Sequence, residues 1–264
     1  MNDVRPHVRE AGHGPGVVCL HANVSHSVQW RALMDQLAPS FHVLAPDSFG
    51  AGRSPAWTCE RPLSMADELA LLAPVFERAG DAFALIGHSY GAALALVAAA
   101  RWPRRVRCLA LYEPTLFSLL DAHQAPPNGA DGIRCVVADV AQALSLGDGR
   151  AAARRFIDFW MGPGSWQSLP QSRRDGIEST IAHAGDWAHA LFNEPTPLAA
   201  LTALDIPLLL MAGRRSPAAS RDVARLLASA WPGVRFIEFD ELGHMGPLTH
   251  PHLVNEHIAA FLSR

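Results

Sequence analysis

A serine and a histidine, far apart in the chain, have the residue types and the local sequence of a nucleophile and its base. Ser89 lies in the stretch ALIGHSYGAALAL, where a strand-like run passes between two glycines into an alanine-rich, helix-like run. Glycine on either side of the serine removes the Cβ clashes of a tight strand-to-helix turn. Such a turn raises the hydroxyl above a sheet, and the following helix directs its unpaired N–H groups toward it. The pattern predicts a nucleophilic Ser89 rather than only a structural turn.

His244 is the best placed of the 13 histidines to act as the base for Ser89. It lies in the glycine-flanked segment DELGHMGPL, directly after the last predicted strand. Imidazole, with an unperturbed pKa of ~6.5, can accept the serine proton at neutral pH and return it to a leaving group. The alternative is a loop histidine with a solvated ring. We interpret His88 as a packing residue, and His250 and His252 as residues at a helix start rather than metal ligands.

Short apolar runs that are typical of strands alternate with longer helical patterns. The strand-like runs begin at Val17, His42, Phe83, Arg107, Pro207 and Val234. Between them, Ser64 and Asp67 have the spacing of a capping box at a helix start. Continuous apolar strands separated by helices predict an α/β fold with a doubly wound, mostly parallel sheet covered on both faces. About one further strand is expected before Val17.

The alternation stops between Pro114 and Leu204, where several amphipathic helices fit the sequence and no strand is predicted. We interpret this segment as a helical cap inserted after the strand that ends near Glu113. Residues 1–113 are then the first part of the core, residues 114–204 the cap, and residues 205–264 the second part of the core.

The composition excludes several classes of function. The chain has 264 residues, of which 49% are hydrophobic, and a formal net charge of −3. It has no basic run and no basic stripe with interleaved aromatic residues, which argues against nucleic acid and membrane surfaces as partners. All 22 basic residues are arginine, and the lack of lysine excludes Schiff-base chemistry, pyridoxal phosphate attachment and a phosphate-loop lysine. A small, uncharged substrate is expected.

The cysteines and the start of the chain bear on location. The four cysteines are widely spaced without a C-x-x-C pair, and Cys19 and Cys108 lie in apolar runs that are typical of reduced, buried thiols. The first residues lack the apolar core of a signal peptide, and no window approaches the ~18 apolar residues of a membrane span. We therefore expect a cytoplasmic protein.

Taken together, the motifs resemble those of the α/β-hydrolase family over nearly the whole chain. They are LHAN after the first clear strand, APDSFGAGRS after the next, GHSYG at the serine turn and LGHMGP near the end. Each motif is weak alone, but their order and spacing match the family. The resemblance implies a serine hydrolase that acts on esters or related acyl compounds without a cofactor or a metal.

The acid member of the expected triad departs from the usual pattern of the family. The family commonly places it after the penultimate strand, where Ser216 stands in PLLLMAGRRSPAAS. In another arrangement, found in many haloalkane dehalogenases, the acid follows the strand after the serine-turn helix, and LALYEPTLF supplies Glu113 there. On this resemblance, Glu113 accepts a hydrogen bond from Nδ1 of His244 and stabilises the imidazolium that forms when Ser89 attacks.

Other interpretations of the acidic residues stay open. Glu113 alternatively caps the first cap helix or pairs with an arginine. Asp240 lies only four residues before His244, and Asp222 falls within a predicted helix, so each is a less natural triad acid. We interpret Asp47, within APDSFGAGRS, as a residue that organises its own glycine-rich turn.

The resemblance also implies two N–H donors for the negatively charged oxygen of a tetrahedral intermediate. One belongs to the residue after the nucleophile, Tyr90, and the other to the loop after the first clear strand. His21, Ala22 and Asn23 occupy that loop, and we assign the second N–H to Asn23. The family usually has His-Gly there, so Ala22 is a departure, and we expect His21 to orient the loop.

The leading hypothesis is a carboxylic-ester hydrolase that works through a Ser-His-Glu triad and an acyl-enzyme. An apolar substrate would be lined by Phe117, Trp160 and Trp187 of the cap, whose alternative role is cap-to-core packing. Alternatives on the same scaffold are a C–C bond hydrolase, a thioesterase, a lactonase, a cofactor-free haloperoxidase or a ligand-binding relative without turnover. HAN with Trp30 resembles the dehalogenase pattern, but a serine nucleophile suits acyl transfer. A homodimer is compatible with the sequence.

Overall fold

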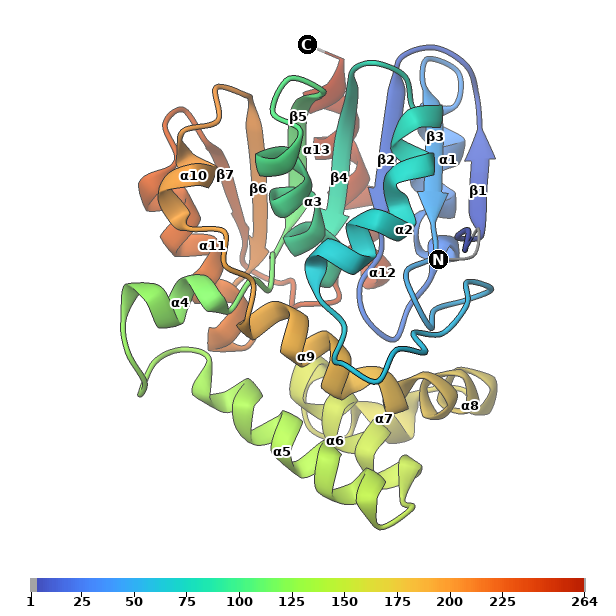
Figure 1. Cartoon of the computed structure of the whole chain (residues 1–264), viewed down its shortest axis with the longest axis vertical. Helices are drawn as coiled ribbons and strands as arrows, with labels where there is room; N and C mark the ends of the chain where they lie inside the picture. The colour runs from blue at the N-terminus through green and yellow to red at the C-terminus, as the bar shows by residue number, and fades with distance from the viewer. Residues whose placement is uncertain (1–3, 264) are drawn as a thin grey trace.

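A seven-stranded sheet forms the centre of the computed structural model, which describes residues 4–263 (Figure 1). The strands are β1 (Val8–Ala11), β2 (Gly16–Leu20), β3 (His42–Pro46), β4 (Phe83–His88), β5 (Val106–Tyr112), β6 (Leu208–Gly213) and β7 (Arg235–Phe239). Their order is β1-β3-β2-β4-β5-β6-β7; β1 is antiparallel to β3, and all other neighbours are parallel. The predicted, mostly parallel sheet is confirmed, and β1 is the strand expected before Val17.

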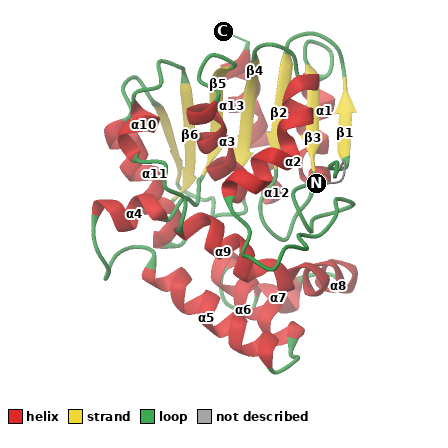
Figure 2. Ribbon diagram, viewed as in Figure 1, coloured by secondary structure: helices red, strands yellow, loops and turns green. Residues whose placement is uncertain are grey.

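Helices cover both faces of the sheet, as Figure 2 shows in red against the yellow strands. The helices outside the insert are η1 (Ser27–Trp30), α1 (Arg31–Leu37), α2 (Met65–Arg78), α3 (Tyr90–Arg101), α11 (Ala218–Ala230), α12 (Gly246–Thr249) and α13 (Pro251–Leu262). Along β2, Val17 and Cys19 belong to the core on the face covered by α1 and α13, whereas Val18 and Leu20 belong to the core on the face covered by α2, α3 and α11. Successive strand residues point to opposite faces, so a continuous apolar run is required here.

The start of α2 follows from the capping box that the sequence predicts. The Ser64 side chain accepts a hydrogen bond from the Asp67 amide, and the Asp67 carboxylate accepts one from the Ser64 amide at 3.0 Å. Both interactions satisfy N–H groups that the first turn of a helix leaves without a carbonyl partner.

A helical insert lies between β5 and β6, at the edge of the sheet where the arrowheads of β3 and β4 end (Figure 1). It contains α4 (Ser118–His123), α5 (Asp131–Ser145), α6 (Gly149–Met161), α7 (Ser165–Ser168), α8 (Gln171–Thr180), η2 (Ile181–His183), α9 (Ala184–Phe192) and α10 (Leu198–Thr202). The predicted inserted helical region is confirmed.

The exact division into 1–113, 114–204 and 205–264 stays a prediction, and its outermost residues, 1–3 and 264, lie outside the described residues. Between residues 4 and 263, no helix has the length and apolar character needed to cross a bilayer.

Helix α6 shows why the insert is ordered. Asp148 caps its first turn by accepting a hydrogen bond from the Ala151 amide at 2.8 Å, and Gly162 ends the helix with a φ of 101°. Its buried face carries Phe156, Ile157 and Trp160 at helical spacing. Burying side chains of this size contributes roughly 1.5–3 kcal/mol each, and it orients α6 toward the sheet edge.

A carboxyl group is buried where α2 packs behind the serine turn. Glu68 is fully buried, and it accepts hydrogen bonds from the Phe49 amide at 3.2 Å and the Tyr90 hydroxyl at 3.1 Å. Burial raises the pKa of Glu68 to about 8, because the ionised form loses its hydration. The folded protein therefore binds a proton at Glu68 over a pH range in which the unfolded chain releases it.

We expect the free energy of unfolding to fall as pH rises from about 5 to about 8, because over this range the unfolded chain has lost the Glu68 proton and the folded protein has not. Glu68→Gln removes this titration, so the melting temperature of the variant should increase relative to that of the wild type as pH rises. The gain corresponds to a few kcal/mol at most. Thermal melts of Glu68→Gln and of the exposed control Glu60→Gln measure it, and a pH-independent difference for Glu68→Gln would contradict the expectation.

Candidate active site

Ser89 lies between the end of β4 and the start of α3, on a tight turn with strained backbone angles. Its φ is 57° and its ψ is −115°, values that a residue with a side chain rarely adopts. A Cβ on Gly91 would lie 2.2 Å from the carbonyl oxygen of Leu20, and a Cβ on Gly87 would lie 2.5 Å from Cα of Ala92. The two glycines are therefore required because backbone approaches them closely, as the sequence predicts.

The structure brings the side chains of Ser89, His244 and Glu113 into one hydrogen-bonded chain. Nε2 of His244 lies 2.9 Å from Oγ of Ser89, and Nδ1 lies 2.6 Å from Oε2 of Glu113. The histidine is 3% exposed and the glutamate is fully buried. A proton on Nδ1 binds the carboxylate, which leaves the lone pair of Nε2 directed at the serine hydroxyl.

Two further hydroxyl groups, from the segment after β6, bind the Glu113 carboxylate. Oε1 accepts hydrogen bonds from Ser216 at 2.5 Å and from the Gly213 amide at 2.6 Å, and Oε2 accepts one from Ser220 at 2.9 Å. Ser216 stands where the family commonly has the acid, and here it supports a carboxylate that comes from β5. The sequence drew attention to position 216 only as a missing acid, so these donors were not predicted.

The other acidic residues lie elsewhere. Asp240 forms an ion pair with Arg214 at 2.9 Å, and its side chain is 70% exposed. Asp222 lies within α11, as predicted. Asp47 accepts hydrogen bonds from the Ser27 amide at 2.6 Å and the Arg53 amide at 3.0 Å, which confirms its role in its own turn. Burial opposes ionisation of Asp47, but the hydrogen bonds from Ser27 and Arg53, together with nearby His21, outweigh it and lower its pKa.

His88 does more than the packing that the sequence predicts. Its Nε2 lies 2.8 Å from the carbonyl oxygen of His244, and its Nδ1 lies 3.0 Å from Nε2 of Gln29. Burial holds the pKa of His88 well below its ordinary value, so the ring is neutral, donates from Nε2 and accepts at Nδ1. Gln29 also accepts a hydrogen bond from the Ala22 amide at 3.2 Å. The ring therefore links the loop after β2 to the loop that carries His244.

His21 orients the loop after β2, as expected. Its Nε2 accepts a hydrogen bond from the Ser48 amide at 3.0 Å, and its Nδ1 lies 2.7 Å from the Ala22 carbonyl oxygen. Burial lowers the pKa of His21, in keeping with a neutral ring that donates from Nδ1.

The predicted N–H donors are those of Tyr90, which follows Ser89 in the chain, and Asn23, which lines the same pocket as Ser89. Tyr90 is the first residue of α3, so its amide has no carbonyl partner within the helix. Asn23 and Val24 line the pocket above Ser89, and Val24 has a φ of 49°. The role of the two amides as donors to a substrate oxygen stays a prediction.

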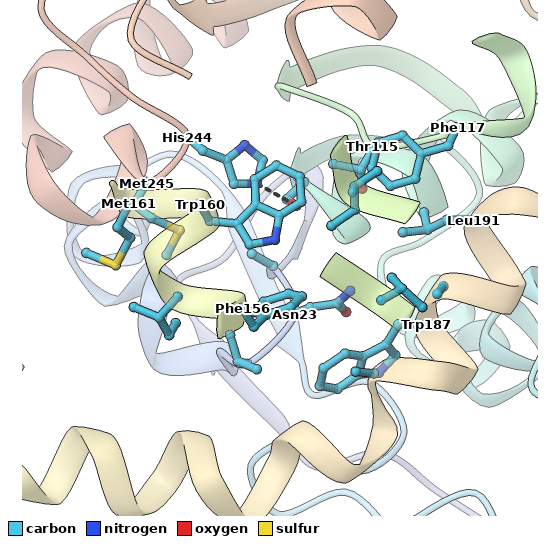
Figure 3. Close-up of a pocket in the computed structure, with 18 of the residues that line it drawn as sticks. Asn23, Thr115, Phe117, Phe156, Trp160, Met161, Trp187, Leu191, His244 and Met245 are labelled. Atoms are coloured by element: carbon cyan, nitrogen blue, oxygen red, sulfur yellow. Dashed lines mark hydrogen bonds between the residues drawn. The ribbon is translucent and has the colours of Figure 1, made fainter. Parts of the chain in front are cut away.

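A pocket lies between the triad and the helical insert (Figure 3). Phe117, Trp160 and Trp187 line it, together with residues that the sequence did not single out for this role: Thr115, Ile133, Phe156, Met161, Leu191 and Met245. The cavity measures about 40 Å³, enough for a few water molecules. Within residues 4–263, no three histidine, cysteine or acidic side chains are grouped as metal ligands.

Comparison with known proteins identifies the same fold as the structure. A family model described as the alpha/beta hydrolase fold matches residues 15–251. Lipase LipV of Mycobacterium tuberculosis is 33% identical over 135 residues, 47% of this chain and 50% of the lipase, so the match spans about half the length of that relative. A pimeloyl-(acyl-carrier protein) methyl ester esterase of Chromobacterium violaceum is 28% identical over 92% of both chains. The crystal structure of an alpha/beta hydrolase from Sphaerobacter thermophilus superposes with a TM-score of 0.71 at 27% identity, covering 94% of this chain and 95% of that one.

Gly91→Ala should destabilise the fold, because the added Cβ would meet the backbone of β2 at a distance that no rotamer change relieves. Overpacking of this kind costs about 1–3 kcal/mol. The matched control is Gly176→Ala in α8, where a Cβ meets nothing within 4 Å; it should stabilise the protein by up to ~1 kcal/mol. Chemical denaturation of both variants measures the difference. A Gly91→Ala protein as stable as the wild type would show that α3 does not pack this closely on β2.

Proposed function

Since the chain belongs to the α/β-hydrolase fold family, we propose that it is a serine hydrolase that cleaves a carboxylic ester through an acyl-enzyme. The observation that carries the proposal is the hydrogen-bonded chain from Ser89 through His244 to Glu113. A serine hydroxyl is a weak nucleophile on its own, and a base within hydrogen-bond reach activates it. The likeness to a methyl ester esterase over 92% of both chains supports the ester as the bond that is cleaved.

In the proposed first step, Oγ of Ser89 attacks the carbonyl carbon of the ester and Nε2 of His244 takes the hydroxyl proton. The tetrahedral intermediate collapses, the C–O bond to the alcohol breaks, and Nε2 gives its proton to the departing alcohol oxygen. In the second step, water attacks the acyl-enzyme, His244 takes a proton from the water, and Ser89 recovers that proton as the acid is released.

Glu113 stabilises the imidazolium that forms in each step. Three donors besides His244 (Gly213 N–H and the hydroxyls of Ser216 and Ser220) bind its carboxylate. Hydrogen bonds from donors favour the charged form of a carboxylate, and burial strengthens its attraction for the imidazolium. The carboxylate also holds the ring in the tautomer that leaves Nε2 free for the serine proton.

The amides of Tyr90 and Asn23 are the proposed donors to the oxyanion. The N-terminus of α3, which begins at Tyr90, adds its positive dipole end beside Ser89. Loss of one such donor typically costs ~3 kcal/mol of transition-state stabilisation.

The lining of the pocket supports a small apolar acyl group as the part of the substrate that it holds. Its side chains are aliphatic, aromatic or thioether groups for the most part, including Ile133, Phe156 and Leu191. Burial of apolar substrate surface against them supplies binding energy, while the triad and the amides act on the carbonyl group.

A fluorophosphonate should label Ser89 covalently, because the activated hydroxyl displaces fluoride from phosphorus. Peptide mass spectrometry locates the adduct. Ser89→Ala should remove the labelling while melting at the wild-type temperature within a few degrees. A folded wild-type protein that neither labels nor hydrolyses a panel of p-nitrophenyl esters would favour a ligand-binding relative without turnover.

Glu113→Gln should lower kcat by ~10³- to 10⁴-fold, because a neutral amide neither stabilises the imidazolium nor enforces its tautomer. The matched control is Asp240→Asn, which changes an exposed ion pair and should leave kcat within about twofold. Steady-state hydrolysis of a p-nitrophenyl ester measures both. The assignment of the acid is wrong if the Asp240 variant, and not the Glu113 variant, loses activity.

A further inference from the structure

The ring of His244 is covered by an aromatic side chain from the helical insert. Trp160, in the last turn of α6, stacks on it with the ring centroids 4.1 Å apart and the planes at 28° (Figure 3). Trp160 is 8% exposed. The imidazole of a serine triad needs only its two nitrogens for proton transfer, so the stack is an additional interaction that the mechanism above does not use.

The stack fixes the one motion of the ring that its hydrogen bonds leave free. The hydrogen bonds to Ser89 and Glu113 fix the direction of the two ring nitrogens, and the lone pair and N–H of an imidazole lie in the ring plane. Tilting out of that plane brings the ring against the indole face. Trp160 is itself held by edge contacts with Phe159 and Phe156, at centroid distances of 4.9 Å and 6.2 Å.

The electrostatics of the stack favour the protonated ring. The face of an indole carries negative charge, and a cation within about 6 Å of its centre is attracted to it, most strongly where water is excluded. During the proposed reaction His244 becomes a cation when it takes the proton of Ser89 or of water. The interaction is thus weak in the resting enzyme and strong in the transition state, which is the condition for a contribution to kcat.

The other charged and titratable groups around His244 do not obscure the effect of Trp160 on the protonation of the imidazole. Among residues 4–263, Glu113, directly after β5, is the acidic residue hydrogen-bonded to the ring. His88 from β4 is neutral, since burial lowers its pKa well below its ordinary value. The Tyr112 hydroxyl donates to the Gly243 carbonyl oxygen at 2.8 Å, and Arg215, after β6, is paired with Glu241.

We propose that Trp160 is a positioning residue that holds the His244 ring in the triad plane and stabilises its protonated form through the indole face. The proposal rests on the proposed function for its effect on the rate, but not for its effect on the protonation of His244. It also makes the basicity of the triad depend on how the insert sits on the core, because α6 carries the indole.

The test compares Trp160→Phe, which keeps an aromatic face, with Trp160→Leu, which fills much of the space without one. Trp160→Phe should keep kcat within about threefold of the wild type, and Trp160→Leu should lower kcat about tenfold with a smaller change in KM. The acid limb of the pH profile of kcat/KM should move to lower pH in Trp160→Leu. Trp166→Leu, which removes a buried tryptophan of the insert away from the pocket lining, is the control for loosened packing, and its acid limb should not move.

Nuclear magnetic resonance of the histidine side chains gives a readout that needs no turnover. In Trp160→Leu, His244 should become protonated at a lower pH than in the wild type, and in Trp160→Phe at nearly the same pH. Entry of water at the mutated site would shift protonation the opposite way, so the direction distinguishes the two effects. Equal behaviour of the Phe and Leu variants, or an upward shift in the Leu variant, would overturn the proposal. A wild type inert toward esters and fluorophosphonate would instead refute the proposed function.

Discussion

The hydrogen bond between Nδ1 of His244 and the Glu113 carboxylate is the interaction on which the rest of the site depends. It fixes the tautomer and direction of the ring that faces Ser89, and it exists only because neighbouring parallel strands end at one edge. Successive strands in the sheet order, β4 to β7, are followed by Ser89, Glu113, Ser216 and His244 in turn. The parallel sheet thus brings four residues that are far apart in the sequence to one edge, where His244 lies between Ser89 and Glu113.

Backbone strain gathers at the same edge. Within the part of the chain that the structure describes, the non-glycine residues with positive φ are Val24, Ser89 and Glu113, and each lies at the pocket or in the triad. Strained residues persist only where their surroundings hold them. The amide of Ser89 donates to Tyr112 and the amide of Glu113 donates to Met211, each at 2.9 Å, so both are bound to the adjacent strand.

Local patterns in the sequence predicted the elements, the serine turn and the residue types of the triad. These features depend on residues close together in the chain: apolar runs for strands, paired glycines for the turn, and Ser64 with Asp67 for a helix start. The contacts of Ser216 with Glu113, His88 with the His244 carbonyl and Trp160 with the imidazole were not predicted. These contacts join segments that come together only in the folded protein. Helical periodicity predicts which face of α6 is apolar, but it does not predict which side chains pack against that face.

The bridge from Ala22 through Gln29 and His88 to His244 has a kinetic consequence. It ties the loop proposed to bind the oxyanion to the loop that presents the base, through side chains that never touch a substrate. A disturbance in either loop is therefore transmitted to the other. Acylation and deacylation would then slow in parallel.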